Sequence, residues 1–317
     1  MKKCYVGIDT SNYTTSAAFC DEEGRVIANL KIPLPVKEGN RGLRQSDAVF
    51  EHVRNLPALM ERLKTEISGY SAVAVGVSAT PRDVEGSYMP CFLSGKAAAY
   101  AFSSAANIPV YEFSHQNGHV YAAIYSSGMS DYLLSQDRFL AFHVSGGTTE
   151  LLLVEPTKKA GDIKVTLIGQ TDDINAGQAI DRVGVSMGLD FPAGRAMEAL
   201  AADYVGKIPR YKVTVRDGAC SLSGVENIAS KLYAENGDKK RVAAFVFDFV
   251  ERTLCEMGKW ATEKYGNMPV LFAGGVMSNR LMRKGLSENF EAYFSEPEFS
   301  ADNAAGIALL CRRKFNE

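Results

Sequence analysis

Short apolar runs at the start of the chain predict three consecutive strands. Residues 3–9 (KCYVGID) and residues 14–20 are apolar enough for buried strands, and RVIANLKI from Arg25 predicts a third. Asp21–Gly24 has the composition of a hairpin turn between the second and the third. The chain therefore opens with an antiparallel meander.

A helical pattern follows from about Ser46 to Ile67, after a polar stretch containing Gly39, Asn40 and Gly42. Ser46 is a candidate N-cap, and Pro57 predicts a kink or a break. The rest of this half predicts two strands and one helix, namely a central strand at 72–78, an Ala-rich helix at 94–106 and a strand at 109–113.

The same order of elements then restarts. Strands are predicted at 138–144, 150–155 and 163–168, followed by helices, the longest at 239–265, a strand at 269–272 and a closing helix at 303–315. Strand-strand-strand-helix-strand-helix written twice is the plan of the actin/hexokinase-like (ASKHA) α/β fold, in which a nucleotide lies in a cleft between the two halves. We expect one half to comprise 1–110 with 296–317, and the other 111–295 with a helical insertion.

Length and composition agree with two domains. The chain has 317 residues, of which 46% are hydrophobic, more than a single core usually needs. Six cysteines without a CxxC pair argue against a disulfide framework or a zinc ribbon. The apolar start is too short for a signal peptide and no run is long enough to span a bilayer, so we expect a soluble, cytoplasmic protein.

The net charge of -2 provides no global positive field that would attract a polyanion. If RNA is a partner, a local patch or another subunit must supply the attraction, and the isolated chain should bind tRNA weakly.

Three turns carry candidate phosphate-binding groups. GIDTSNYTTS places hydroxyls that can meet a phosphate between two strands, together with Asp9, whose carboxylate can hold a hydrated cation, although polar residues are common in any hairpin. HVSGGTTEL offers Ser145, Gly146 and Gly147, whose backbone a ligand could approach closely, with an ordinary glycine hairpin as the alternative. AGGVMSNR puts Gly274 and Gly275 between a strand and a helix, with Asn279 one turn into that helix.

Two histidines are spaced for a shared metal ion. His115 and His119 are four residues apart, so on a helix their rings lie on one face; a pair of capping or half-buried histidines is the alternative. With four histidines in the chain, a carboxylate is the expected third ligand, and Asp302 is the candidate unless it only caps the closing helix. His52 is expected on a helix surface and His143 in a strand.

An acidic segment, DDINAGQAIDRVGVSMGLDFPAG, precedes a tight turn. Asp172, Asp173 and Asp181 suit ribose hydroxyls or a cation, but the first two would serve equally as helix caps.

These motifs, in the order GIDTS, HxxxH, VSGG, DxxxGxxxD, PxG, SG, GGVxxNxxxR and DNAA, resemble the tRNA threonylcarbamoyladenosine transferases, formerly called glycoproteases. The resemblance implies one iron or zinc ion on His115, His119 and Asp302. It implies adenylate contacts at six matching positions: Ser145, Gly146, Gly147, Asp181, Gly194 and Asn279. ATP, AMP or threonylcarbamoyl-AMP would be the nucleotide, and Mg²⁺ is a further candidate.

The implied activity is transfer of the threonylcarbamoyl group to adenosine 37 of tRNA, or a related carbamoyl transfer, with partner proteins and a homo- or heterodimer as candidate assemblies. The chain departs from the family pattern at Asn12, Asn117 and Thr148. A paralogue that uses another acceptor or serves as a scaffold is therefore an alternative. A metalloprotease is poorly motivated because HQNGH lacks the glutamate of HExxH.

Overall fold

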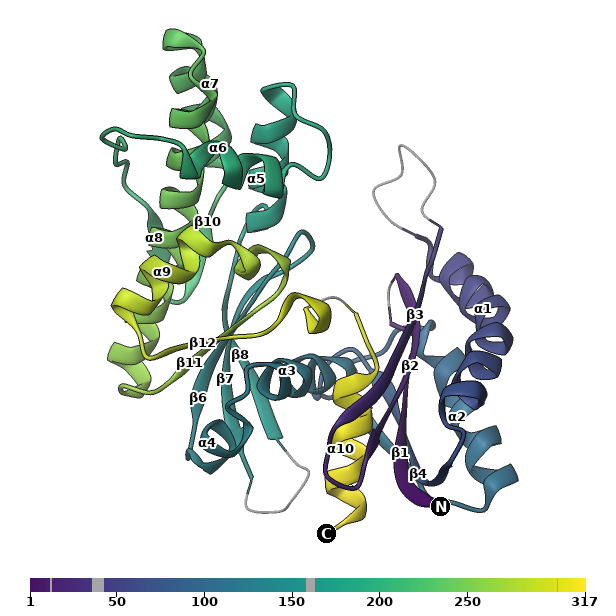
Figure 1. The fold of residues 1–317 in the computed structure, drawn as a ribbon. Coiled ribbons are helices and arrows are strands. Elements are labelled where there is room, and N and C mark those ends of the chain that lie inside the picture. The colour runs from purple at the N-terminus through teal and green to yellow at the C-terminus, as the bar shows by residue number, and fades with distance from the viewer. Residues whose placement is uncertain (12, 36–42, 158–162, 301) are drawn as a thin grey trace. The chain divides into compact units, whose positions relative to one another are not determined.

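The opening strands pair as the apolar runs predict. The computed structural model describes residues 1–11, 13–35, 43–157, 163–300 and 302–317, which leaves Asn12 and the stretch with Gly39, Asn40 and Gly42 outside it. The antiparallel meander consists of β1 (Lys2–Asp9), β2 (Thr14–Asp21) and β3 (Val26–Pro33). β4 (Tyr70–Thr80) and β5 (Val110–Ser114) extend it in parallel, giving the order β3-β2-β1-β4-β5 (Figure 1).

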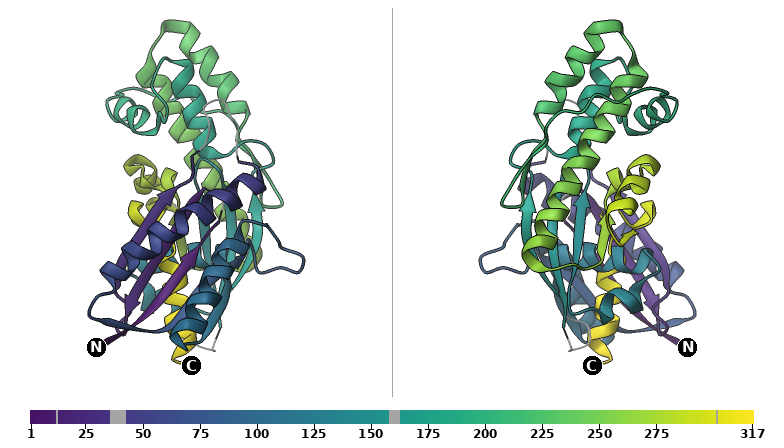
Figure 2. Two further views of the ribbon diagram at one scale, coloured as in Figure 1. Left: turned by 90° about the vertical axis from the view of Figure 1, so that its right-hand side faces the viewer. Right: turned by 90° about the vertical axis from the view of Figure 1, so that its left-hand side faces the viewer.

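Helices cover both faces of this sheet. α1 (Gln45–Glu66) and α2 (Phe92–Ala106) pack on one face, and α3 (His115–Ser126) and α10 (Ala305–Phe315) lie on the other (Figures 1 and 2). β1 runs so close to α10 that a Cβ atom on Gly7 would lie 2.5 Å from the carbonyl oxygen of Ala304. A glycine is therefore required where the strand and the helix meet.

The second sheet repeats the strand order of the first. β6 (Phe139–Val144), β7 (Thr149–Pro156), β8 (Ile163–Gln170), β11 (Val270–Ala273) and β12 (Ala292–Phe294) lie in the order β12-β11-β6-β7-β8. In each sheet, three strands that are consecutive in sequence lie side by side. Two later strands extend the sheet on the side of the first of these three. This repetition confirms the predicted ASKHA fold.

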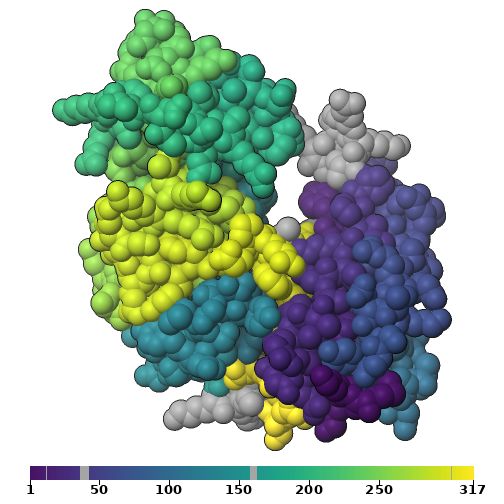
Figure 3. Space-filling model, in the orientation of Figure 1, coloured from purple at the N-terminus to yellow at the C-terminus, as the bar shows by residue number. Residues whose placement is uncertain are grey.

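The remaining elements belong mainly to the second half. The yellow surface that includes α9 adjoins the teal-green surface that includes α6 (Figure 3). They are α4 (Ser130–Ser135), α5 (Ala176–Ser186), α6 (Gly194–Ala202), β9 (Thr214–Arg216), β10 (Ala219–Ser221), α7 (Gly224–Asn236), α8 (Lys239–Tyr265), η1 (Gly275–Ser278), α9 (Arg280–Asn289) and η2 (Pro297–Phe299). The longest predicted helix, 239–265, coincides with α8.

The chain divides into two compact units. The first comprises Met1–Ser130, Glu155–Val165 and Glu298–Glu317, and the second Asp131–Val154 and Thr166–Pro297. The predicted boundary after residue 110 assigns α3 to the second half, whereas α3 packs on α10 within the first unit. None of the helices in the described ranges is both long and apolar enough to cross a membrane.

Helix α1 differs from its prediction in two local features. Its N-cap residue is Arg44, which makes no side-chain capping bond, so Ser46 lies inside the helix instead of capping it. The helix also continues through Pro57 without a break. Pro57 is exposed, while Leu56, Leu59 and Leu63 are buried against the sheet. Burial of this apolar face outweighs the loss of one backbone hydrogen bond.

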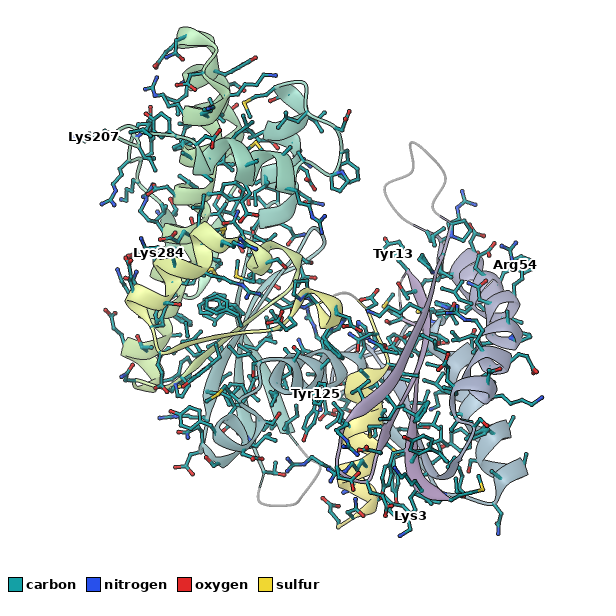
Figure 4. All side chains as sticks on the ribbon, viewed as in Figure 1. Lys3, Tyr13, Arg54, Tyr125, Lys207 and Lys284 are labelled. Atoms are coloured by element: carbon teal, nitrogen blue, oxygen red, sulfur yellow. The ribbon has the colours of Figure 1, made fainter. Side chains whose placement is uncertain are left out.

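The expectation of a surface position for His52 was wrong. Its side chain is fully buried between α1 and the sheet, whereas Arg54 projects outward from the same helix (Figure 4). His52 Nδ1 lies 2.9 Å from the hydroxyl of Thr15, which also accepts a bond from Asn55. Burial lowers the pKa of His52 to about 4, against the opposing effect of nearby carboxylates.

This burial predicts an acid-sensitive contribution to stability. The pKa of His52 falls from 6.5 to about 4 on folding, so the contribution is complete above pH 6.5 and is lost as the pH falls toward 4, because only the unfolded chain takes up the proton in that range. The shift corresponds to about 3 kcal/mol. In urea unfolding, His52→Asn, which keeps an acceptor for Thr15, should lose less stability than the parent between pH 7 and pH 4.5. Equal losses would contradict the assignment.

Candidate metal and nucleotide sites

The two histidines predicted to share a metal ion converge with the distant aspartate. His115 begins α3 and His119 follows one turn later, with ring centroids 4.3 Å apart. His119 Nε2 lies 3.1 Å from Asp302 Oδ1, and His115 Nε2 lies 3.7 Å from the same oxygen. All three candidate ligand atoms are within 4.8 Å of one another.

These separations suit a divalent ion. Ligands at about 2.0–2.1 Å from a tetrahedral centre lie roughly 3.3–3.5 Å from each other. The two measured separations from Asp302 Oδ1, 3.1 and 3.7 Å, bracket that range. Two imidazoles and one carboxylate are also a donor set that leaves a coordination position open for substrate. The residues present therefore fit a catalytic type of metal site.

Asp9 holds the first histidine in the orientation that this site needs. Its Oδ2 lies 2.7 Å from His115 Nδ1 and accepts a hydrogen bond from Ser78 Oγ, while Oδ1 accepts one from the backbone of Ser11. Burial alone would raise the pKa of Asp9, but the charge and hydrogen bond of His115 with these donors keep it well below its usual range. An anionic Asp9 fixes Nδ1 as the donor and leaves Nε2 for a metal.

The structure settles the alternative role for Asp302. The N-cap of α10 is Ala304. The backbone amide of Ala305, at the start of the helix, donates a hydrogen bond to Asn303 Oδ1. The Asp302 carboxylate instead faces His119. Asp302 is therefore a member of the histidine cluster and does not cap the helix.

Asn117 lies between the two histidines in sequence but does not join their cluster. It is buried, and its amide donates to the carbonyl of Ile163. Ser114 is the last residue of β5 and the N-cap of α3, and its hydroxyl accepts a hydrogen bond from the backbone amide of Asn117. Asn117 thus stabilises the start of the helix that carries the histidines.

In the second unit, the β6–β7 turn is closed by its own hydrogen bonds and leaves two glycines exposed. Ser145 Oγ accepts bonds from the backbone amides of Gly147 and Thr148, and the carbonyl of Ser145 accepts one from Gly177 at the start of α5. Gly146 and Gly147 are exposed, and a Cβ atom on either would meet no other group within 4 Å. The fold therefore leaves open space in front of both glycines.

A pocket of about 630 Å³ opens beside this turn within the second unit. It brings together Gly146 and Asp181, both predicted from the sequence. Asp181 also accepts a hydrogen bond from the backbone of Ala193, which places Gly194 at the adjoining start of α6. The other lining residues were not predicted, and no motif marks them: Gln178, Arg182, Val185, Ser186 and Phe191.

The glycine pair after β11 reaches the same edge of the second sheet. Ala273 pairs with His143, so Gly274 follows β11 where Ser145 follows β6. A Cβ atom on Gly274 would lie 2.2 Å from the carbonyl oxygen of Val144, and its φ is +101°. Packing alone thus requires this glycine.

The expected helix start at Gly275 is replaced by the short turn η1. α9 begins only at Arg280, and Asn279 is its N-cap, with its side chain accepting from Met282. Asn279 therefore lies at the beginning of α9 and not one turn inside it.

The acidic segment before α5 is tied to its own chain. Asp173 accepts bonds from the backbone amides of Leu222 and Ser223 and from the hydroxyl of Ser221. The N-cap of α5 is Asn175. Asp173 therefore joins two loops of the second unit, instead of capping the helix.

Comparison with known families agrees with this arrangement. Residues 37–309 match the family model TsaD, tRNA N6-adenosine threonylcarbamoyltransferase. The chain belongs to the TsaD family. The match spans most of the chain and includes both histidines, the glycine turns and Asp302, so the family resemblance noted from the motifs is confirmed.

Solved structures show that this TsaD-family chain shares its fold with diverse proteins. Full-length HypF in a phosphate- and nucleotide-bound form is 12% identical at a TM-score of 0.59, covering 99% of this chain and 56% of HypF, so the chain spans little more than half the length of that protein. A ROK family glucokinase from Streptomyces griseus, in complex with glucose and AMPPNP, is 15% identical, with a TM-score of 0.54 and coverages of 98% and 99%. Component A of the Acidaminococcus fermentans (R)-2-hydroxyglutaryl-CoA dehydratase is 12% identical, with a TM-score of 0.55 and coverages of 99% and 100%.

Proposed function

We propose that this protein transfers a threonylcarbamoyl group from threonylcarbamoyl-AMP to the N6 amino group of adenosine 37 in tRNA. The observation that carries the proposal is the convergence of His115 Nε2, His119 Nε2 and Asp302 Oδ1 in a chain of the TsaD family. Iron or zinc is the candidate ion, and a bound divalent ion would polarise the carbonyl of the transferred group as a Lewis acid.

The bonds exchanged in this reaction need no nucleophilic side chain. The N6 nitrogen of adenosine forms a bond to the carbamoyl carbon, the bond from that carbon to the phosphate oxygen breaks, and AMP leaves with the electron pair. One N6 proton is released. The protein's contribution is therefore to hold the donor and to stabilise charge on the reacting carbonyl.

The chain's own residues supply distinct parts of this task. Asp9 orients His115 through Nδ1 and leaves its Nε2 for an ion. The turn at Ser145–Gly147 has open space in front of its two glycines, which leaves room for the phosphate of the donor beside the backbone. Asp181 lies in the adjoining pocket, where its second carboxylate oxygen suits a ribose hydroxyl. The positions at Ser145–Gly147 and Asp181 are among those that the family resemblance implies, whereas Asp9 is not.

Nucleoside mass spectrometry tests the proposal directly. The metal-loaded protein is incubated with threonine, bicarbonate, ATP, an adenylate-forming partner protein and candidate tRNAs. A partner is included because a chain with net charge -2 is expected to hold tRNA weakly by itself. Threonylcarbamoyladenosine should accumulate with the parent and with the surface variant Asp203→Asn, but not with Asp302→Ala.

If no tRNA is modified although the parent binds metal and adenylate, another acceptor replaces tRNA. A chain that neither binds metal nor turns over the donor would be a scaffold.

A further inference from the structure

A lysine lies on the same sheet face as the histidine cluster and is not used by the roles above. In the first sheet, Asp9 pairs with Ser16 on β2, and Ser16 pairs with Lys31 on β3. Residues directly opposite each other on neighbouring strands point to the same face. Lys31 therefore projects from the face on which Asp9 contacts His115, about 10 Å away along the row of strands.

The ammonium of Lys31 reaches toward the cluster. Its Nζ donates a 2.8 Å hydrogen bond to the carbonyl oxygen of Glu298, a few residues before Asp302. Burial lowers the pKa of Lys31, and the charges of Glu298 and Asp302 oppose that shift. Within the described ranges, no carboxylate lies at ion-pair distance from this ammonium.

An ammonium group can donate three hydrogen bonds, and Lys31 uses one of them on the backbone carbonyl of Glu298. The two remaining donors are available to a ligand, and an anion is the partner that an ammonium binds most strongly. The adenylate phosphate has its own candidate loop in the second unit, at Ser145–Gly147. The remaining anion on an amino-acid carbamoyl donor is the carboxylate of the amino acid, which lies only a few bonds from the carbonyl that is transferred.

We propose that Lys31 binds the carboxylate of the transferred amino-acid carbamoyl group, so that the protein selects such a group over an unsubstituted carbamoyl. This inference rests on the proposed function. Lys31 would act as a specificity residue, which fixes the acyl group through an ion pair while the histidine cluster faces its carbonyl.

Binding measurements without tRNA test this role. Calorimetry on the metal-loaded protein compares N-carbamoyl-L-threonine with its methyl ester, which lacks the negative charge. The parent should prefer the acid by roughly 10- to 100-fold, the range expected for a charge-assisted hydrogen bond. Lys31→Gln should lose the preference and Lys31→Arg should keep most of it. Lys64→Gln, a change at an exposed lysine paired with Glu61, should match the parent.

Three results would overturn the inference. In the first, the parent binds neither compound or binds both equally. In the second, Lys31→Gln keeps the preference for the acid. In the third, Lys31→Gln loses its metal, which would show that the lysine only tethers the segment before Asp302. Failure to modify tRNA leaves these binding results unaffected, so it would count against the proposed acceptor and not against Lys31.

Discussion

His115→Ala should purify with almost no bound metal, whereas the parent should hold about one ion per chain. Three protein ligands leave little redundancy, because removal of one imidazole leaves a two-ligand site. The side chain is also largely enclosed by its partners, so no neighbouring donor can replace it easily. Metal content measured by inductively coupled plasma mass spectrometry after reconstitution and dialysis gives the stoichiometry.

Two further variants separate ligation from general damage. Asp9→Asn removes the negative charge behind His115 Nδ1 and should weaken metal affinity by roughly 10- to 100-fold without abolishing it. His52→Asn changes another buried histidine of the first unit, one that supplies no ligand atom to the cluster, and should keep the parent's metal content. Unchanged stoichiometry in His115→Ala would refute the site.

Gly147→Val should weaken the binding of AMP or ATP by at least about tenfold. The two glycines of the turn are exposed, and a branched side chain in the open space before them would keep a phosphate from approaching the backbone. The fold itself should tolerate the change, because a Cβ atom there meets nothing within 4 Å. Isothermal titration calorimetry with AMP measures the effect, and thermal unfolding confirms that the variant is folded.

Gly224→Val is the matched control for this prediction. Gly224 also belongs to the second unit, lies at the start of α7 and has open space around its Cβ position. It is not among the residues that line the pocket. If Gly147→Val bound AMP as tightly as Gly224→Val and the parent, the β6–β7 turn would not be a phosphate loop.

The sequence alone identified what depends on local pattern. Apolar runs located the strands of both meanders, and the helical pattern at 239–265 matched α8 because one long face of that helix is buried. The spacing of His115 and His119 was informative since residues four apart share a helix face. Eight ordered motifs were enough to recognise the family.

Local signals were weaker where packing competes with them. Ser46 and Pro57 are ordinary helix-boundary residues, yet α1 begins before the first and continues through the second because its leucines pack on the sheet. His52 has no sequence feature that separates it from a surface histidine. Its burial depends on which face of α1 meets β2, and that is decided by the whole sheet.

The chemistry of the cluster was decided by tertiary structure. Asp9 is separated from His115 by 106 residues, and His119 from Asp302 by 183, so only the packing of α3 and α10 on the first sheet and on each other brings them together. The same packing gives Asp9 its role as the partner of Nδ1 and places Lys31 on the face of the cluster. The sequence thus determined the family and the residue types of the candidate metal ligands. The packing of strands and helices determined the geometry of the cluster, because hydrogen bonds and metal coordination depend on distances that sequence separation does not encode.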